Sequence, residues 1–290
     1  MLWVLLSIFA SWALIVQIQI NQKHKYSGII LNNYRSLFST GLLVPFIPFM
    51  EFPQDVTFYL VCFLTAAISV VCMTVQYNLA AKKNGRVANL HQPLVIFLTF
   101  IAWLIIDQSQ LEFFKDNWIN SFLVVLSFLV LFASIQHIRK NDIGWEALKA
   151  VIPIALLYSV LVIASKLILE TGQNAIAISL CFVFVSNFMM CLMIYPLIKS
   201  RFYKETEKVD VNRTFMISTF GVAFFHTVSW ILISLAFILA PNAAYPVAIT
   251  SLCPVWFMIY YWVTKQKDDA SPVAGLVMAC GATLLVLAGQ

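Results

Sequence analysis

Ten stretches of predominantly apolar residues, each about 20 residues long, follow one another along nearly the whole chain. A helix of about 20 residues rises about 30 Å, which is the thickness of the hydrocarbon core of a bilayer. Only 11% of the residues are charged, against about 25% in soluble domains. The sequence therefore predicts an all-α integral membrane protein with ten transmembrane helices. These predicted helices span residues 2–20, 28–50, 56–80, 87–106, 118–138, 147–169, 175–198, 214–239, 243–263 and 272–288.

Two of the stretches, 87–106 and 243–263, share a short polar run followed by a proline, Pro93 in one and Pro254 in the other. A proline inside a helix removes a backbone donor and kinks the helix. Within a bilayer the freed carbonyl is tolerated only where protein or a cavity satisfies it. We therefore predict a helix kink at each proline and a substrate path between the two helices.

The lysines and arginines are distributed unequally between the predicted loops. Fifteen of the eighteen lie near the loops after the first, third, fifth, seventh and ninth helices, whereas the loops after the second, fourth, sixth and eighth hold only Lys115. Positively charged loops tend to remain in the cytoplasm, so both termini are predicted to lie outside. The net charge of +5 is thus explained by membrane topology, and we expect no nucleic-acid partner.

The two halves of the chain, residues 1–141 and 142–290, resemble each other weakly. Aligning Trp12 with Tyr158 brings Gln19 onto Ser165, and the two proline-containing helices align as well. Five spans per half is an odd number, so the second half enters the membrane in the opposite sense. This pattern predicts two inverted five-helix repeats.

Residue patterns typical of membrane enzymes and metal sites are missing from the sequence. It has no HExxH, no GxGD, no GxSG with a later histidine, and no paired aspartates within a predicted span. The six cysteines lie within apolar segments, and none has CxxC spacing. We therefore expect no enzymatic activity, no bound metal and no cofactor.

Short motifs recur in order over the ten predicted spans. They are Ser11-Trp12-Ala13, Asn33-Tyr34-Arg35, Tyr77-Asn78-Leu79-Ala80, the run from Pro93 to Trp103 closed by Asp107, Leu235-Ala236, Ser251-Leu252-Cys253-Pro254-Val255-Trp256, and the small residues Gly275, Ala279 and Gly281. Taken together, this ordered set resembles the ten-helix EamA-type members of the drug/metabolite transporter superfamily. Two features depart from the family: Asp107 stands where a Gly-Glu pair is usual, and the charges favour external rather than cytoplasmic termini.

The resemblance implies a secondary transporter that works by alternating access in the cell (inner) membrane. It also implies a substrate cavity lined by the first, third, fourth, sixth, eighth and ninth helices, with the fifth and tenth packed behind. The implied partners are a small-molecule substrate and membrane lipid, and the implied state is a monomer or weak homodimer.

Arg35 is the first candidate for substrate recognition, because an arginine within a span is costly unless it has a partner or reaches the interface. It either meets an anionic group of the substrate or snorkels to the membrane surface. No aspartate or glutamate lies deep in a predicted span, which disfavours proton-coupled antiport of cationic drugs. A neutral, zwitterionic or anionic metabolite fits better.

His91 and His226 are the only histidines within predicted spans. Either could serve as a coupling group near neutral pH, or could bond to a neighbouring helix as a neutral side chain. The other candidates are polar or aromatic residues of the helices assigned to the cavity, and for each of these the alternative is an interhelical bond. The complete predicted substrate-binding set is Trp12, Gln19, Arg35, Tyr77, Asn78, Asn89, His91, Gln92, Tyr158, Ser165, His226, Trp230, Ser251 and Trp256.

The function expected from these features is transport of a small polar organic metabolite, amino-acid-like and zwitterionic or anionic. Two alternatives remain open from the sequence, an intramembrane enzyme of lipid metabolism and a non-transporting membrane receptor. Flux of a solute through the purified protein separates transport from both.

Overall fold

The computed structural model describes residues 2–82, 91–142, 145–199, 211–265 and 272–289, and these residues form helices joined by short connections. In chain order the helices are α1 (Leu2–His24), α2 (Gly28–Leu43), the 3₁₀-helix η1 (Val44–Phe49), α3 (Val56–Lys82), α5 (Gln92–Ile106), α6 (Gln108–Asp116), α7 (Trp118–Asp142), α8 (Trp145–Leu169), α9 (Ala175–Lys199), α10 (Arg213–Leu239), α11 (Ala244–Thr250), α12 (Cys253–Thr264) and α13 (Pro272–Ala288). The prediction of an all-α protein is confirmed over the described residues.

Several of these helices are long and apolar enough to cross a membrane. Within the described part of the chain, α1, α3, α8, α9 and α10 meet this condition, and α5 with α6 would form a sixth span if the bent pair crosses as one. Shorter apolar helices occur in α7, α11–α12 and α13. The chain therefore has the character of a multi-pass membrane protein.

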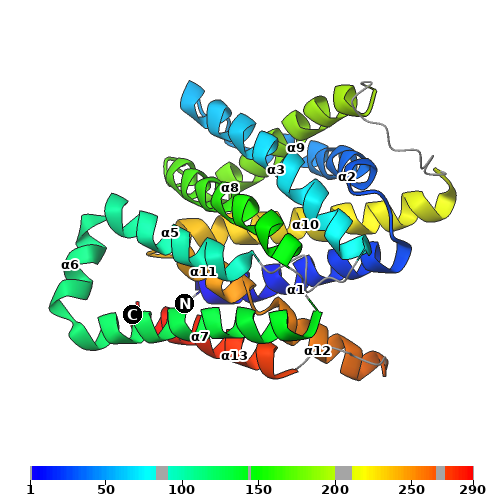
Figure 1. The fold of residues 1–290 in the computed structure, drawn as a ribbon. Coiled ribbons are helices and arrows are strands. Elements are labelled where there is room, and N and C mark those ends of the chain that lie inside the picture. Colours follow the sequence, from blue (N-terminus) through cyan, green and yellow to red (C-terminus); the bar gives the residue numbers. More distant parts are fainter. Residues whose placement is uncertain (1, 83–90, 143–144, 200–210, 266–271, 290) are drawn as a thin grey trace.

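One helix, α6, lies in the segment predicted to be a loop between the fourth and fifth spans. Its axis is bent by 100° from that of α5. Asp107 caps its first turn, because the carboxylate accepts a hydrogen bond of 3.1 Å from the backbone N–H of Ser109. The side chain of Gln110 then donates to the carbonyl oxygen of Pro241 at 2.6 Å. Asp107 therefore ends α5 and starts a helix that lies across one end of the bundle (Figure 1).

In the described residues α5 begins at Gln92, so Pro93 occupies its first turn. Residues 87–90 of the predicted span lie outside the described residues, so the kink at Pro93 stays a prediction. Proline is well tolerated at that position, since the N–H that it lacks would have no partner within the helix. Asn89, which precedes it, lies outside the described residues.

The second proline stretch is broken, as predicted, although Pro254 again lies at a helix start. Two turn residues separate α11 from α12, and Pro254 is the second residue of α12. Proline at position 254 leaves the carbonyl of Thr250 without its usual helical donor. The hydroxyl of Ser11 on α1 donates to this oxygen at 3.3 Å, and the thiol of Cys253 donates at 3.1 Å. Protein groups thus satisfy the freed carbonyl.

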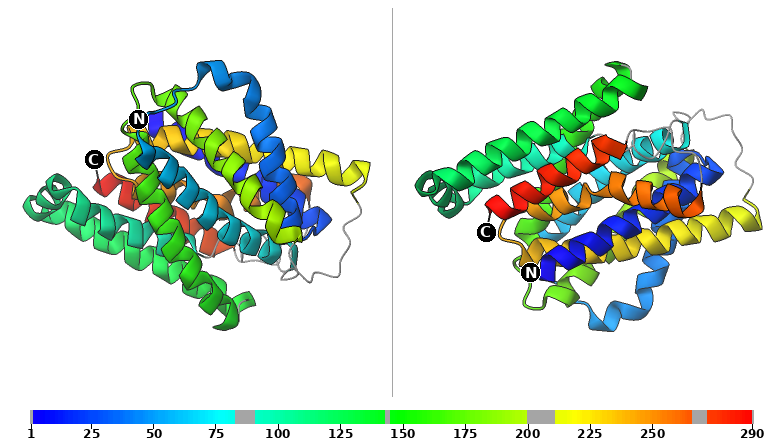
Figure 2. Two further views of the ribbon diagram at one scale, coloured as in Figure 1. Left: turned by 90° about the horizontal axis from the view of Figure 1, so that it is seen from above. Right: turned by 90° about the horizontal axis from the view of Figure 1, so that it is seen from below.

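The helices pack as an elongated bundle in which partners are often distant in sequence (Figures 1 and 2). The long helix α1 lies against α10, where the hydroxyl of Ser229 donates to the carbonyl of Ala10 at 2.9 Å. The pair α7 and α13 lies side by side along one edge, and α2 packs against α9 on the other side. These contacts bury small and apolar residues between helices that have no continuous polar face.

The two ends of the bundle carry different charges. At one end lie both termini (Figure 1), with Trp3 stacked on Tyr245 at 6.2 Å between ring centroids. At the same end Glu51 accepts hydrogen bonds of 3.0 Å from the backbone N–H groups of Gln173 and Asn174, which joins two loops. The other end carries the described basic residues Lys23, Lys25, Lys199, Arg213 and Lys265. This arrangement agrees with the alternation of charge along the sequence.

Candidate functional site

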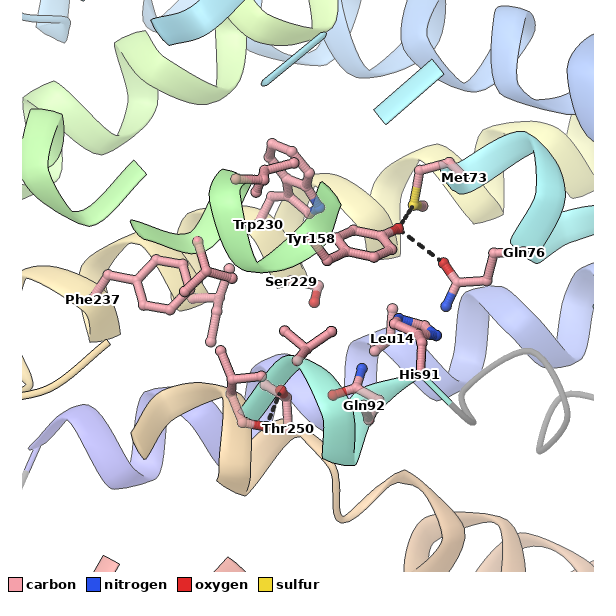
Figure 3. Close-up of a pocket in the computed structure, with 15 residues that line it drawn as sticks. Leu14, Met73, Gln76, His91, Gln92, Tyr158, Ser229, Trp230, Phe237 and Thr250 are labelled. Atoms are coloured by element: carbon pink, nitrogen blue, oxygen red, sulfur yellow. Dashed lines mark hydrogen bonds between the residues drawn. The ribbon is translucent and has the colours of Figure 1, made fainter. Parts of the chain in front are cut away.

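A cavity of about 130 Å³ lies in the middle of the bundle, between α1, α3, α5, α8, α10 and α11 (Figure 3). It is lined by Leu14, Met73, Gln76, His91, Gln92, Val95, Tyr158, Leu161, Val162, Ser229, Trp230, Ile233, Phe237, Val247 and Thr250. A cavity of about 150 Å³ in a protein core can hold benzene, so this one matches a small organic solute.

The lining is apolar over most of its area and polar toward one end. His91, Gln92 and Gln76 lie together at the end nearer the basic end of the bundle, whereas Phe237 lies at the opposite end (Figure 3). Among the lining residues that the structure describes, there is no aspartate, glutamate, lysine or arginine. Such a cavity suits a solute with an apolar body and a polar group at one end.

Tyr158 on α8 connects the polar groups of this end. Its hydroxyl donates to the side-chain oxygen of Gln76 at 3.3 Å and lies 3.0 Å from the sulfur of Met73. Its ring is stacked on the imidazole of His91, with 4.9 Å between centroids and 16° between planes. Helices α3, α5 and α8 therefore meet at a single phenol ring.

Gln92 and Trp230 are the other lining residues that the sequence predicted. The amide oxygen of Gln92 is buried and has no hydrogen-bond partner among the described residues, so it is free to accept from a solute. Trp230 is stacked on Phe182 at 6.5 Å and lies 5.3 Å from His226, measured between ring centroids. His226 itself is fully buried behind Trp230 and does not line the cavity.

Arg35 does not line the cavity and does not snorkel. It is 0% exposed, and its guanidinium donates to the side-chain oxygen of Asn32 at 3.1 and 2.8 Å and to the sulfur of Met190 at 2.7 Å. The Nη1 atom of Arg35 has no partner among the described residues. Arg35 is therefore held between helices and does not reach the membrane surface, and its contact with a substrate stays a prediction.

Three predicted residues make interhelical or local bonds outside the cavity. The hydroxyl of Tyr77 donates to Gln17 at 3.2 Å. The side-chain oxygen of Asn78 accepts from the backbone N–H of Gly28 at 2.7 Å, which fixes the start of α2 against α3. The hydroxyl of Ser251 bonds within its own turn, to the carbonyl of Ala248 at 2.6 Å.

The other predicted residues also lie away from the lining. Trp12 is 46% exposed on the outer face of α1, where its ring meets Phe225 edge-on, so its assignment to the cavity is wrong. Ser165 is buried beside the cavity-lining face of α8, while Gln19 and Trp256 are half-buried. Each of these three residues has one buried polar atom without a hydrogen-bond partner among the described residues.

Several lining residues were not predicted, and Gln76 is the most informative of them. It is a glutamine within a strongly apolar helix, one residue before the predicted Tyr77. Ser229 and Trp230 are likewise adjacent on α10. A polar residue within an apolar span was the available signal, but the sequence could not indicate which face of α3 or α10 turns inward.

Lys166 is bonded to the backbone of Phe237, the lining residue at the apolar end of the cavity. Its side chain is 1% exposed, and its ammonium group donates to the carbonyls of Phe237 and Ala240, at 2.8 and 2.7 Å, and to Glu170 at 2.6 Å. It also lies 5.0 Å from the centre of the Trp103 ring on α5. Lys166 thus satisfies carbonyls at the end of α10 and joins that end to α5 and α8, rather than reaching the interface as a snorkelling lysine would.

No model of a known protein family matches this chain, and no curated protein matches it either. The fold and the cavity define the class, an all-helical protein with several candidate membrane spans that surround a small internal cavity.

Proposed function

We propose that this chain is a secondary transporter that moves a small organic metabolite across the cell (inner) membrane by alternating access. The observation that carries the proposal is the cavity, whose walls come from three helices of each half of the chain. Transporters built from repeats place their substrate site at such an interface between the halves. Apolar walls with a few polar groups at one end suit the binding of an organic solute.

The packing of the helices supports two inverted repeats with ten spans in total. In this assignment α1, α2, α3, α5 and α7 correspond to α8, α9, α10, α11–α12 and α13. The contact between α1 and α10 then corresponds to the contact between α8 and α3. In the same way, the α2–α10 contact corresponds to the α9–α3 contact, and the α1–α11 contact corresponds to the α8–α5 contact. The pairs α2–α9, α5–α11 and α7–α13 each correspond to themselves. Exchanging the two halves thus leaves the main pattern of helix contacts unchanged.

Alternating access requires that the cavity open first to one end and then to the other. At the apolar end, Lys166 joins α8 to α10 and α5. At the polar end, His91 is stacked on Tyr158, and Tyr158 donates to Gln76. Each set of contacts joins helices of both halves through a few side chains, so a rocking motion of one half against the other would break one set at a time.

A catalytic role is less well supported by the lining of the cavity. A membrane hydrolase or transferase needs a nucleophile with a base, or a metal site. The ionisable side chains in the described part of the lining are His91 and Tyr158, and these two are stacked on each other. We therefore propose that the protein is not an enzyme. A flux measurement distinguishes a transporter from a receptor without transport activity.

The test is uptake of a broad metabolite panel into proteoliposomes that contain the purified protein. Wild type, Arg35→Ala and the outward-facing variant Trp12→Ala are compared at equal reconstituted amounts. We expect saturable flux of at least one solute in the wild type and in Trp12→Ala, and altered flux in Arg35→Ala. Absence of flux for every solute in the panel would reject transport and favour a receptor.

A further inference from the structure

Gln92 carries a buried amide oxygen that has no hydrogen-bond partner among the described residues, although its side chain lines the internal cavity. A buried acceptor without a partner costs free energy, which a bound donor recovers. The same amide carries two N–H donors beside this oxygen. A solute that presents an N–H next to an acceptor can pair with both edges of the group, as adenine does with a glutamine side chain. Gln92 therefore calls for a solute with a donor placed beside an acceptor.

The start of α5 holds Gln92 at the cavity wall. Gln92 is the first residue of that helix and is 9% exposed. The first turn is closed by the backbone N–H of Val95, which donates to the carbonyl of His91 at 3.0 Å. In Figure 3 Gln92 and Thr250 lie on one wall of the cavity, and Tyr158 lies on the opposite wall. The amide is thus in place to meet a solute without a change in the backbone.

Three hydroxyl groups of the lining already donate to protein atoms. Ser229 donates to the carbonyl of Ala10 at 2.9 Å, and Thr250 donates to the carbonyl of Val247 at 2.8 Å. The hydroxyl of Tyr158 also donates within the lining. A hydroxyl whose hydrogen is engaged can still accept through its oxygen. These groups therefore favour a solute that brings N–H donors, which an ionised carboxylate lacks.

The other walls of the cavity disfavour a charged solute. Leu14, Val95, Leu161 and Ile233 are apolar, and the described part of the lining holds no aspartate, glutamate, lysine or arginine. Removing an ionised group from water costs far more than removing an amide, unless an opposite charge pairs with it. An ammonium group would also leave the N–H donors of Gln92 without an acceptor. The lining thus fits an uncharged group that both donates and accepts.

We propose that Gln92 pairs with the amide edge of a small uncharged solute, a carboxamide or a lactam, whose apolar body occupies the cavity. This inference rests on the proposed transport function where it makes this solute the substrate, whereas the binding site itself does not depend on transport. The cavity of about 130 Å³ limits the solute to about the size of benzene. Of the neutral, zwitterionic and anionic metabolites that the sequence left open, the inference selects a neutral one.

The experiment measures thermal unfolding of the purified full chain in detergent at increasing concentrations of matched probes. One pair is the lactam pyrrolidinone and its isostere γ-butyrolactone, in which a ring oxygen replaces the N–H. Isobutyramide, sodium isobutyrate and isobutylammonium chloride form a second set with similar apolar bodies, compared at equal ionic strength. A ligand of the native state raises the Tm with concentration.

The variants are Gln92→Met and, as the matched control, Gln22→Met. Methionine keeps the approximate volume of the glutamine side chain without its amide. Gln22 lies in the last turn of α1, outside the described lining of the cavity. Its amide oxygen is also buried without a partner among the described residues, so the two variants remove equivalent groups.

We expect pyrrolidinone and isobutyramide to raise the Tm of wild type and of Gln22→Met. γ-Butyrolactone, isobutyrate and isobutylammonium should need at least about tenfold higher concentrations for the same shift, which is the factor that one hydrogen bond provides. Gln92→Met should respond to pyrrolidinone no better than wild type responds to γ-butyrolactone. The comparison of lactam with lactone in wild type needs no variant, so it decides the inference even if Gln92→Met fails to fold.

Equal shifts with pyrrolidinone and γ-butyrolactone, or an undiminished lactam effect in Gln92→Met, would overturn the pairing with Gln92. A larger shift with isobutyrate or isobutylammonium than with isobutyramide would overturn the uncharged class. No shift with any probe would overturn both and leave buried water as the partner of Gln92. Lactam binding without flux of any solute would reject only the proposed transporter, and flux confined to charged solutes would reject only the substrate class.

Discussion

The imidazole ring of His91 lies parallel to the phenol ring of Tyr158 at the polar end of the cavity, within 16° and with 4.9 Å between ring centroids. His91 immediately precedes α5, and Tyr158 lies in the middle of α8. The stack therefore joins a helix of the first half to a helix of the second. A contact of this kind must change when the halves move relative to each other.

His91→Ala should lower flux in proteoliposomes while the yield of folded protein stays close to that of wild type. The substitution removes a ring stack worth about 0.5–1.5 kcal/mol and widens the cavity where its polar groups lie. The matched control is His24→Ala, because His24 is stacked on Tyr26 at 5.3 Å but at the end of α1, away from the cavity. Unchanged flux in His91→Ala would assign the stack to packing alone.

Lys166→Met should lower the thermal stability of the protein. It leaves the carbonyls of Phe237 and Ala240 without their charged donor, a loss of about 1.5–3 kcal/mol for each hydrogen bond made by a charged group. Glu170 is 41% exposed, so Glu170→Gln should cost only about 0–1 kcal/mol. Thermal unfolding in detergent measures both, and equal losses in the two variants would show that the ion pair, not the carbonyl contacts, carries the stabilisation.

Ser11→Ala should destabilise the break between α11 and α12 by about 1 kcal/mol, because it removes the α1 donor to the carbonyl of Thr250. Ser7→Ala is the matched control on the same helix. Among the described residues its hydroxyl bonds to the carbonyl of Trp3 in the preceding turn of the same helix, so its loss should be close to neutral. The measurement is the difference in Tm between the two variants, and a larger shift in Ser7→Ala would contradict the role given to Ser11.

A reporter enzyme fused to the C-terminus should be active outside the cytoplasm, whereas a reporter placed after Lys265 should be active inside it. The expectation follows from the gathering of basic residues at the end opposite both termini, since positively charged loops are retained in the cytoplasm. Alkaline phosphatase and green fluorescent protein fusions report the two sides. A cytoplasmic C-terminus would reverse the orientation of the whole bundle.

The positions of the helices were largely predictable, because apolar stretches of sufficient length form helices wherever water cannot satisfy the backbone. The exceptions have local causes. Asp107 caps α6 in a segment that is too polar and too short to be recognised from hydrophobicity. Pro45 and Pro48 convert the end of the second predicted span into the 3₁₀-helix η1.

The cavity-lining faces of the helices were much less predictable. Within α1, Leu14 lines the cavity whereas Trp12, only two residues earlier, is 46% exposed on the outer surface. In a membrane protein the face toward lipid is as apolar as the face toward the protein interior, so hydrophobic periodicity does not distinguish them. Tyr158 and Trp230 were predicted from their chemical character, and the same reasoning wrongly included Trp12.

The proline stretches show the division between sequence and structure. The sequence by itself predicted interruptions at Pro93 and Pro254, because proline denies the backbone a hydrogen bond in any fold. The described residues contain the second of these, the break between α11 and α12. Only the tertiary structure decided that each proline lies at a helix start, that Ser11 of α1 reaches the freed carbonyl of Thr250, and that Arg35 is enclosed rather than at an interface. Those outcomes depend on which helices meet, and this choice arises from packing between segments far apart in the chain.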